Sequence, residues 1–320
     1  MSEEQNINQQ FQSLRIIFMG TPEFALASLD LLVNNHCNIV AVVTSPDKQA
    51  GRGMKMNESA VKKYAIEKGL KILQPEKLKS TEFLRQLESL KADLQVVVAF
   101  RMLPEVVWGM PRMGTINLHG SLLPQYRGAA PINWAIINGE KETGVTTFKL
   151  QHQIDTGNIL LQESFSIGEN ETAGELHDRM KLIGAQLLFK TIKGISDGSL
   201  KEKPQADFVD QTNQPVIKYA PKIFTETCKI DWKKPVDEIH NLIRGLSPFP
   251  GAFTYLDNKM LKIFRSRKEH ISHSDTPGTY RTDEKNILKF ACADGYIHAE
   301  EVQLEGKKRM AVADFLRGYK

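Results

Sequence analysis

The sequence predicts an α/β protein of two domains, a larger one with a mostly parallel β-sheet and a smaller β-barrel after it. Three observations support this fold class. The chain has 320 residues, more than a single domain usually holds. Apolar strand-like runs alternate with helical segments as far as residue 198, which is typical of βαβ units. After that, short strand-like runs separated by turns indicate a small barrel.

The composition is that of an ordinary globular protein, with 41% hydrophobic and 25% charged residues. No apolar run approaches the ~18 to 20 residues of a membrane-spanning helix, and residues 1–12 do not resemble a signal peptide. We therefore expect a cytoplasmic protein without a membrane partner. Cys37, Cys228 and Cys292 are far apart and form no C-x-x-C pair, which argues against a disulfide framework and against a metal site.

The first strand is expected at residues 14–19, and it leads directly into a helix that ends near Val33. Thr21 suits the N-cap of this helix, and Pro22 suits its first position because the N–H that proline lacks has no helical partner there. Gly20 stands alone, without the G-x-G-x-x-G spacing of dinucleotide sites. A dinucleotide cofactor is therefore not expected.

The following elements are predicted from hydrophobic periodicity and from turn residues. Strands are expected at residues 39–44, 93–99, 114–119, 144–150 and 158–167, and helices at residues 59–68, 81–90, 134–138 and 172–195. The last of these helices opens with a capping box formed by Thr172 and Glu175.

These elements make up a Rossmann-like domain at residues 13–198. Residues 199–225 are polar and rich in proline, so we interpret them as a linker. An OB-like domain is expected at residues 226–320. Residues 208–320 hold 19 Lys and Arg against 15 Asp and Glu, whereas residues 1–207 hold 23 of each. A basic face on this domain can bind a polyanion, although solvated lysines are the commoner explanation.

The chemistry is expected at residues 114–131, where an apolar strand runs into a loop punctuated by glycine and proline. Because side chains alternate along a strand, Asn117 and His119 emerge on the same face. Loops at the carboxyl ends of sheet strands are where open α/β folds bind ligands. Taken singly, either residue would be an ordinary polar residue near a loop. The inference rests on the ordered pattern N-x-H-G-S-L-L-P-x-Y-R-G.

This pattern, from Asn117 to Gly128, resembles the folate-binding signature of the 10-formyltetrahydrofolate-dependent formyltransferase superfamily. Within the superfamily the chain is most similar to the methionyl-tRNA formyltransferases, most strongly between Pro46 and Gly157. The resemblance implies transfer of a formyl group from 10-formyltetrahydrofolate to the α-amino group of initiator methionyl-tRNA. It implies no metal, and we expect a monomer.

The resemblance also implies three catalytic residues, Asn117, His119 and Asp155. By itself, Ile154-Asp155-Thr156-Gly157 is typical of a turn between two strands, and the superfamily's catalytic aspartate occupies this turn. The amide can donate to the oxyanion that develops during formyl transfer. The imidazole can donate or carry a proton, and the carboxylate can accept the proton that the attacking amine sheds.

The folate site is implied to lie along the signature and to be closed by the loop near residue 100. Its expected lining residues are Ser121, Leu122, Leu123, Pro124, Phe100 and Arg101. Two segments depart from the family pattern. Residues 99–104 are one residue shorter than the usual A-Y-G-L-I-L-P, and residues 150–154 replace the common M-D-x-G-L.

The acceptor is implied by a basic loop at residues 46–55. Its P-D-x-x-A-G-R-G pattern resembles the insertion loop that methionyl-tRNA formyltransferases place against the acceptor stem. Arg52 is the leading tRNA contact, and Lys48, Lys55 and the basic C-terminal domain would hold phosphates. Without the resemblance, such a charge run would be interpreted as a solvated loop.

Three alternatives compete with this expectation. A sugar-nucleotide N-formyltransferase can share the three catalytic residues and the signature, but a sugar nucleotide offers no acceptor stem to the basic loop. A catalytically silent RNA-binding protein would have no need for the three residues. A glycinamide ribonucleotide formyltransferase would leave the residues beyond about 210 without a purpose.

Overall fold

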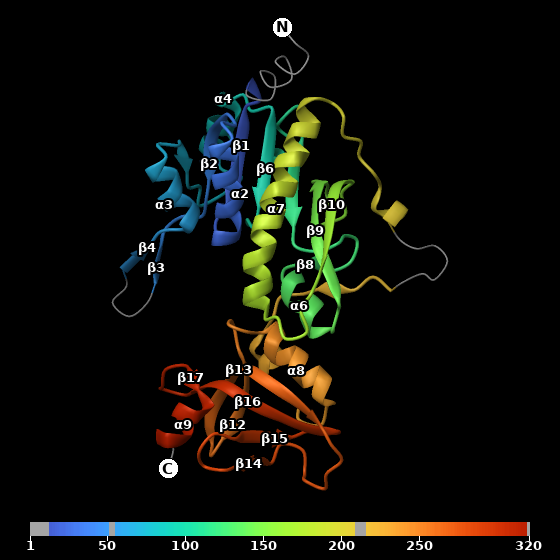
Figure 1. Cartoon of the computed structure of the whole chain (residues 1–320). Coiled ribbons are helices and arrows are strands. Elements are labelled where there is room, and N and C mark those ends of the chain that lie inside the picture. Colours follow the sequence, from blue (N-terminus) through green and yellow to red (C-terminus); the bar gives the residue numbers. More distant parts are fainter. Residues whose placement is uncertain (1–12, 51–54, 209–215, 319–320) are drawn as a thin grey trace. The chain divides into compact units, whose positions relative to one another are not determined.

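The computed structural model describes residues 13–50, 55–208 and 216–318, which divide into two compact units (Figure 1). The described residues within 1–127, 144–164 and 178–218 form unit 1. Residues 128–143, 165–177 and the described residues from Tyr219 onward form unit 2. Within these described residues, no helix combines the length and apolar character that crossing a bilayer requires.

Unit 1 is built on one seven-stranded sheet. Its strands are β1 (Ile16–Gly20), β2 (Ile39–Val43), β5 (Ile72–Leu73), β6 (Leu94–Val98), β7 (Thr115–His119), β9 (Glu142–Lys149) and β10 (Ile159–Ser166). Their order is β10-β9-β7-β6-β1-β2-β5. Neighbouring strands from β7 to β5 are parallel, and β9 runs antiparallel to β7. The predicted α/β class with a mostly parallel sheet is confirmed.

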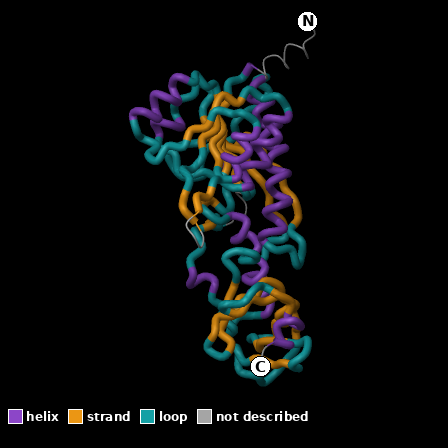
Figure 2. The backbone as a smooth tube through the Cα atoms, turned by 90° about the vertical axis from the view of Figure 1, so that its left-hand side faces the viewer, coloured by secondary structure: helices purple, strands orange, loops and turns teal. Residues whose placement is uncertain are grey.

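Helices lie on both sides of these strands (Figure 2). On one face, apolar side chains of α4 (Thr81–Ser89) and α5 (Glu105–Trp108) share a buried cluster with Ile17, Met19 and Val97 of the sheet. On the other face lie α2 (Glu23–Asn34) and α7 (Ala173–Ser196). The predicted capping box of α7 is confirmed, because Thr172 N donates to Glu175 Oε2 at 2.9 Å and Glu175 N donates to Thr172 Oγ1 at 3.3 Å.

The predicted N-cap at Thr21 is wrong. The residue at the cap position is Pro22, which has no side-chain hydrogen bond to the helix, and Glu23 is the first helical residue. The Thr21 hydroxyl lies 3.1 Å from Ser45 Oγ at the end of the neighbouring strand. A tertiary hydrogen bond thus replaces the local one that the sequence suggested.

Several short elements lie between the longer ones, and most of them were not predicted from the sequence. They are β3 (Lys48–Ala50), β4 (Lys55–Asn57), α3 (Ala60–Glu67), β8 (Arg127–Gly128), α6 (Pro131–Ile137), η1 (Gln205–Phe208), β11 (Tyr219–Ala220) and η2 (Thr225–Cys228). Two of them, η1 and β11, fall in the segment predicted to be a linker.

Unit 2 contains an antiparallel sheet that curls into a half-barrel. Its strands are β12 (Ala252–Leu256), β13 (Lys259–His270), β14 (Tyr280–Thr282), β15 (Leu288–Ala291), β16 (Gly295–Leu304) and β17 (Met310–Ala311). Helix α8 (Val236–Gly245) packs on β13, and α9 (Val312–Gly318) packs near β16. The indole of Trp232 stacks on Phe290, with ring centroids 4.6 Å apart. The predicted small β-barrel that follows the parallel-sheet domain is confirmed as this curled antiparallel half-barrel.

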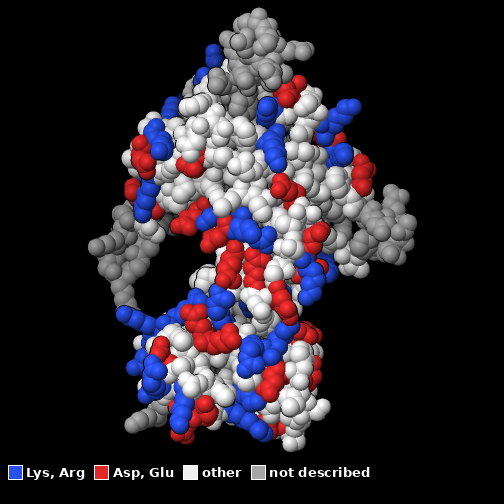
Figure 3. All heavy atoms as spheres, viewed as in Figure 1, with Lys and Arg blue, Asp and Glu red and all other residues white. Residues whose placement is uncertain are grey.

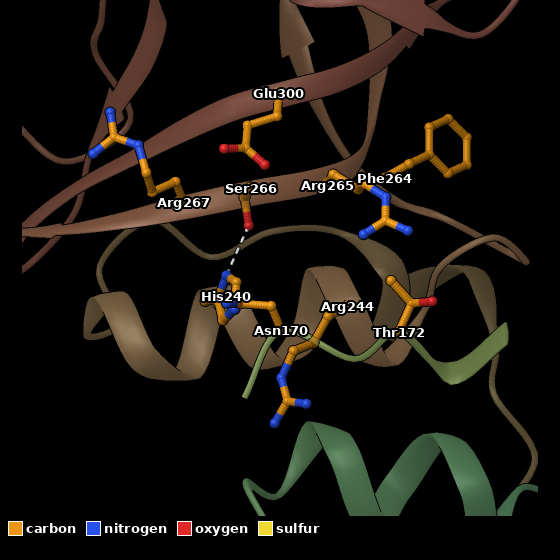
Figure 4. Close-up of a pocket in the computed structure, with 9 residues that line it drawn as sticks. All are labelled: Asn170, Thr172, His240, Arg244, Phe264, Arg265, Ser266, Arg267 and Glu300. Carbon is orange, nitrogen blue, oxygen red and sulfur yellow. Dashed lines mark hydrogen bonds between the residues drawn. The ribbon is translucent and has the colours of Figure 1, made fainter. Parts of the chain in front are cut away.

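A polar cavity of about 200 Å³ lies within unit 2 (Figure 4). Its wall includes His240 of α8 and Ser266 of β13, whose Nδ1 and Oγ atoms are 3.0 Å apart. His240 is only 3% exposed. Burial, and after it the charges of Arg244 and Lys268, lower the pKa of His240 to about 4, against smaller opposing effects from Glu169 and Asp237. The folded protein therefore holds this imidazole neutral.

Mild acid is expected to destabilise the protein through His240. The unfolded imidazole has a pKa near 6.5, so between about pH 6.5 and 4 the unfolded state binds the extra proton. The stabilisation is fully present above this window, and about 2 kcal/mol of it is lost by pH 5. Urea unfolding at pH 7.5 and pH 5 should show this difference in the wild type and not in His240→Gln. The exposed His152, replaced in the same way, is the control, and equal pH dependence in His240→Gln and wild type would contradict the expectation.

Candidate active site

Two polar side chains share one face of β7. Leu118 points to the opposite face, since a Cβ added to Gly184 of α7 would lie 3.0 Å from Leu118 Cδ2. Asn117 and His119 therefore project on the other side, at the carboxyl end of the strand. Asn117 is half-buried, and within the described residues its side-chain amide has no hydrogen-bond partner. That amide is free to donate to a bound molecule.

His119 is buried and fixed by the loop that follows it. Its Nε2 lies 2.9 Å from the carbonyl oxygen of Tyr126. Because a carbonyl can only accept, we assign the proton of the neutral ring to Nε2. Nδ1 then faces Asp155, whose Oδ2 is 3.9 Å away. Nδ1 and the carboxylate are both acceptors, so the gap between them suits a group that carries a proton.

Asp155 lies in a tight turn between β9 and β10. The Thr156 hydroxyl donates to the carbonyl oxygen of Gln153 at 3.0 Å. Asp155 has a φ of +54°, in the left-handed region that residues with a side chain seldom adopt. At Gly157 an added Cβ would lie 1.6 Å from the carbonyl oxygen of Lys149. Only glycine therefore fits at this position of the turn.

The part of the Asn117–Gly128 pattern that follows β7 is called the signature loop here. Two residues that were not among the predicted site residues hold its backbone by hydrogen bonds. Thr146 Oγ1 donates to the carbonyl oxygen of Ser121 at 2.6 Å and accepts from Leu123 N at 3.1 Å. Gln162 Nε2 donates to the carbonyl oxygen of Leu123 at 2.8 Å. Threonine at a buried strand position was the available signal, because a buried hydroxyl needs a partner.

The expected folate-lining residues differ in exposure. Ser121, Leu123 and Pro124 are buried, and the Ser121 hydroxyl donates to the carbonyl oxygen of Gln125 at 2.6 Å. Leu122 is half-buried. The Ser121 hydroxyl therefore stabilises the conformation of the loop in which it lies.

Phe100 and Arg101 follow β6, beyond Ala99, which has a φ of +45°. The Arg101 guanidinium donates from Nη1 to the carbonyl oxygen of Glu76 at 3.0 Å and from Nη2 to that of Pro75. It also lies 5.5 Å from the centroid of the Phe100 ring. Burial lowers the pKa of Arg101 below its usual value. This arginine ties its loop to the segment after β5.

The structure describes the basic loop up to Ala50 and again from Lys55. Strands β3 and β4 form a hairpin in which Lys48 pairs with Asn57 and Ala50 pairs with Lys55. The expected tRNA contact Arg52 lies outside the described residues. Asp47 anchors the base, because it accepts from Lys62 and from Gln74 Nε2 at 2.9 Å. These hydrogen bonds, that of Lys62 first, hold the pKa of Asp47 below its usual value.

The charges of unit 2 are mixed on the face that Figure 3 shows, with Lys and Arg interspersed among Asp and Glu. Some cations are paired, for example Lys289 with Glu269 at 2.8 Å. Lys233, Lys259 and Lys307 have no ion-pair partner in the described part of the chain. Nor does that part contain a cluster of His, Cys, Asp and Glu arranged to hold a metal ion.

Two family models match the chain. Residues 14–192 match the model described as formyl transferase, and residues 222–320 match the model described as formyl transferase, C-terminal domain.

Similar proteins span nearly the whole chain. A Bacteroides fragilis protein named methionyl-tRNA formyltransferase is 50% identical over 313 residues, which cover 96% of both chains. A Phocaeicola vulgatus protein of the same name is 52% identical over 315 residues, which cover 97% of both chains. Among solved structures, the sugar 3N-formyl transferase WlaRD, crystallised in the presence of dTDP and 5-N-formyl-THF, superposes with a TM-score of 0.67. It is 25% identical, and the match covers 92% of this chain and 99% of that one.

Proposed function

The chain belongs to the formyl transferase family, and we propose that it transfers a formyl group from 10-formyltetrahydrofolate to the α-amino group of initiator methionyl-tRNA. The product, N-formylmethionyl-tRNA, serves translation initiation. The observation that carries this proposal is about 50% identity, over 96% of both chains, to a protein named methionyl-tRNA formyltransferase.

The side chains at the carboxyl end of β7 fit the donor. As the amine attacks the formyl carbon, negative charge develops on the formyl oxygen. The Asn117 amide can donate to that oxygen, because it is half-buried and has no competing partner among the described residues. Leu122 and Pro124 of the signature loop, together with Phe100 after β6, are the proposed contacts of the folate itself. Ser121, Leu123 and Arg101 shape the two loops.

Asp155 accepts and returns the proton, and His119 helps to orient the amine. The methionyl amine must lose a proton when its nitrogen bonds to the formyl carbon, and N10 of the folate must gain one when its bond to that carbon breaks. The amine nitrogen can approach both His119 Nδ1 and Asp155 Oδ2, which lie 3.9 Å apart, and give its proton to the carboxylate, directly or through water. The protonated carboxyl group can then return this proton to N10, which balances the transfer. His119 donates through Nε2 to Tyr126, so the ring stays oriented throughout.

The proposed function requires that the release of tetrahydrofolate depend on the aminoacyl group of the tRNA, and this can be tested. Adding methionyl-tRNA to the protein and 10-formyltetrahydrofolate should release tetrahydrofolate in stoichiometric amount, together with formylated tRNA. Deacylated tRNA should release none, because it carries no α-amine. Release that does not depend on the aminoacyl group would contradict the proposal.

The basic loop is proposed to hold the acceptor stem, with Arg52 as the leading contact and Lys48 and Lys55 on phosphates. Lys48 is the first residue of β3 and Lys55 the first residue of β4, so both belong to the hairpin that carries the loop, which supports this proposal. Arg52→Ala is expected to raise the KM for methionyl-tRNA about tenfold, since one contact of this kind is worth about 1 to 3 kcal/mol. The KM for the folate should not change. The matched variant Arg85→Ala, on helix α4, should leave both values as they are, and an unchanged tRNA KM in Arg52→Ala would remove the loop from the interface.

Catalysis and tRNA binding are proposed to lie in different domains. Residues 13–198 are the proposed catalytic domain, residues 226–320 the proposed tRNA-binding domain, and residues 199–225 the linker between them. Lys233, Lys259 and Lys307 are candidates for phosphate contacts, because they have no ion-pair partner among the described residues. Binding through such contacts weakens as salt rises. We further propose that the protein acts in the cytoplasm as a monomer, which sedimentation with and without tRNA would test.

The sugar-nucleotide alternative has one observation in its favour, since WlaRD shares the fold over 92% of the chain. Identity separates the two candidates. It is 25% to the sugar enzyme and 50% to the tRNA enzyme of Bacteroides fragilis. The tRNA acceptor is therefore the better supported.

A further inference from the structure

We propose that Gln205 is a positioning residue, whose side-chain amide clamps the turn carrying Asp155 to the loop that follows His119. The inference rests on the proposed formyl transfer, because it concerns the same site. Gln205 is the first residue of η1 and lies in the segment predicted to be a linker.

Gln205 is 5% exposed, and all of the hydrogen-bonding capacity of its side-chain amide is used. Its Nε2 donates to the carbonyl oxygens of Asp155 at 2.8 Å and of Gly157 at 2.9 Å. Its Oε1 accepts from Arg127 Nε at 3.1 Å and from Arg127 Nη2. A primary amide offers two donors and two acceptor positions, and each meets its complement here. The opposite orientation would place oxygen against two carbonyls, so the network fixes the amide.

The turn depends on outside support because its backbone is unusual. Asp155 has a φ of +54°, which is strained for a residue with a side chain. One amide holds the carbonyl groups on both sides of Thr156, those of Asp155 and Gly157. The direction in which the Asp155 carboxylate leaves the turn is thereby fixed.

The other end of the clamp leads to His119. Arg127, which donates to Gln205, directly follows Tyr126, and the carbonyl oxygen of Tyr126 is 2.9 Å from His119 Nε2. Gln205 therefore joins the two segments whose side chains face each other across the 3.9 Å gap between His119 and Asp155. A misplacement of about 1 Å at such a gap can lower a rate about 100-fold.

Gln205 is itself mounted on a fixed segment. Two residues earlier, Lys203 N donates to the carbonyl oxygen of Ile159 at 2.9 Å, and Ile159 N donates to that of Lys203 at 2.8 Å. This bridge attaches the segment to the first residue of β10. The clamp therefore holds the turn against the sheet and does not move with it.

The test compares Gln205→Met and Gln205→Glu with the wild-type chain. Methionine keeps the length and removes all four hydrogen bonds, whereas glutamate keeps the pairing with Arg127 and replaces both donors by acceptors. Both variants should lower the kcat of methionyl-tRNA formylation about tenfold, with the KM of each substrate changed by less than about twofold. Amide hydrogen exchange should accelerate in a peptide covering residues 153–158 and not in β1 or β6.

Gln95→Met is the matched control. Gln95 is 1% exposed in β6 of the same unit, and its Oε1 accepts from Thr115 Oγ1 at 3.1 Å. This variant also removes a buried amide, so it should lower thermal stability and leave kcat and exchange at residues 153–158 unchanged.

Three results would overturn the clamp: wild-type kcat in Gln205→Glu, unchanged exchange at residues 153–158 in both Gln205 variants, or an equal loss of kcat in Gln95→Met. If the wild-type chain formylates no methionyl-tRNA, the proposed function fails. The exchange measurement then still decides whether Gln205 holds the turn.

Discussion

Asp155→Asn is expected to lower the kcat of formyl transfer about 10²- to 10⁴-fold, the usual range for loss of a positioned general base. Asparagine has nearly the same size and tolerates the left-handed φ of +54°, so the turn keeps its shape. The neutral amide cannot accept the proton of the attacking amine. Single-turnover transfer to methionyl-tRNA would measure the loss.

The pH dependence sharpens this expectation. An α-amino group has a pKa of about 8, so above that pH the nucleophile has already lost its extra proton. The neutral amine must still lose one proton as its nitrogen bonds to the formyl carbon, so the loss of rate in Asp155→Asn should persist between pH 7 and pH 9. Asp93→Asn is the control, because Asp93 pairs with Arg112 beyond the amino end of β6. If Asp155→Asn retained more than about a fifth of the wild-type kcat at pH 7, water and not Asp155 would be the base.

Asn117→Ala is expected to lower kcat about 10²- to 10³-fold, the effect of removing one oxyanion donor. The KM of each substrate should change little, because the hydrogen bond strengthens only as charge develops on the formyl oxygen. Asn117→Asp, nearly identical in shape, should be slower still, since a carboxylate repels the oxyanion. Steady-state kinetics with both substrates would separate kcat from KM.

An exposed amide gives the comparison for this prediction. Asn35 lies at the carboxyl end of α2, where its Nδ2 donates to the carbonyl oxygen of Leu31 at 2.8 Å. Asn35→Ala should keep the wild-type kcat. A similar kcat in Asn117→Ala and wild type would assign the oxyanion to other donors.

Local patterns predicted the elements that are long and periodic. The alternation at residues 115–119 placed Asn117 and His119 on one face of a strand, and Leu118 indeed points toward α7. The Thr172 and Glu175 capping box also depends only on neighbouring residues, and it is confirmed. Structures that depend only on neighbouring residues can be predicted from the sequence, because no contact with a distant residue is needed to form them.

Features made by distant residues could not be predicted in this way. Thr21 has the right chemistry for an N-cap, yet its hydroxyl meets Ser45 instead. Strands β8 and β11 have two residues each, so only their pairing defines them. Gln205 is 50 residues from Asp155 in the sequence and stands among polar residues and prolines. Nothing in that segment marks it as part of a site.

The most direct test of the proposed function is a competition in one vessel. Initiator methionyl-tRNA and a dTDP-linked amino sugar, at equal concentration, would compete for labelled formyl groups from 10-formyltetrahydrofolate. Nearly all of the label should enter the tRNA product, and Asn117→Ala and Asp155→Asn should abolish this labelling within the same time. Label found mainly on the sugar would contradict the tRNA acceptor and would leave only the family and the site chemistry standing.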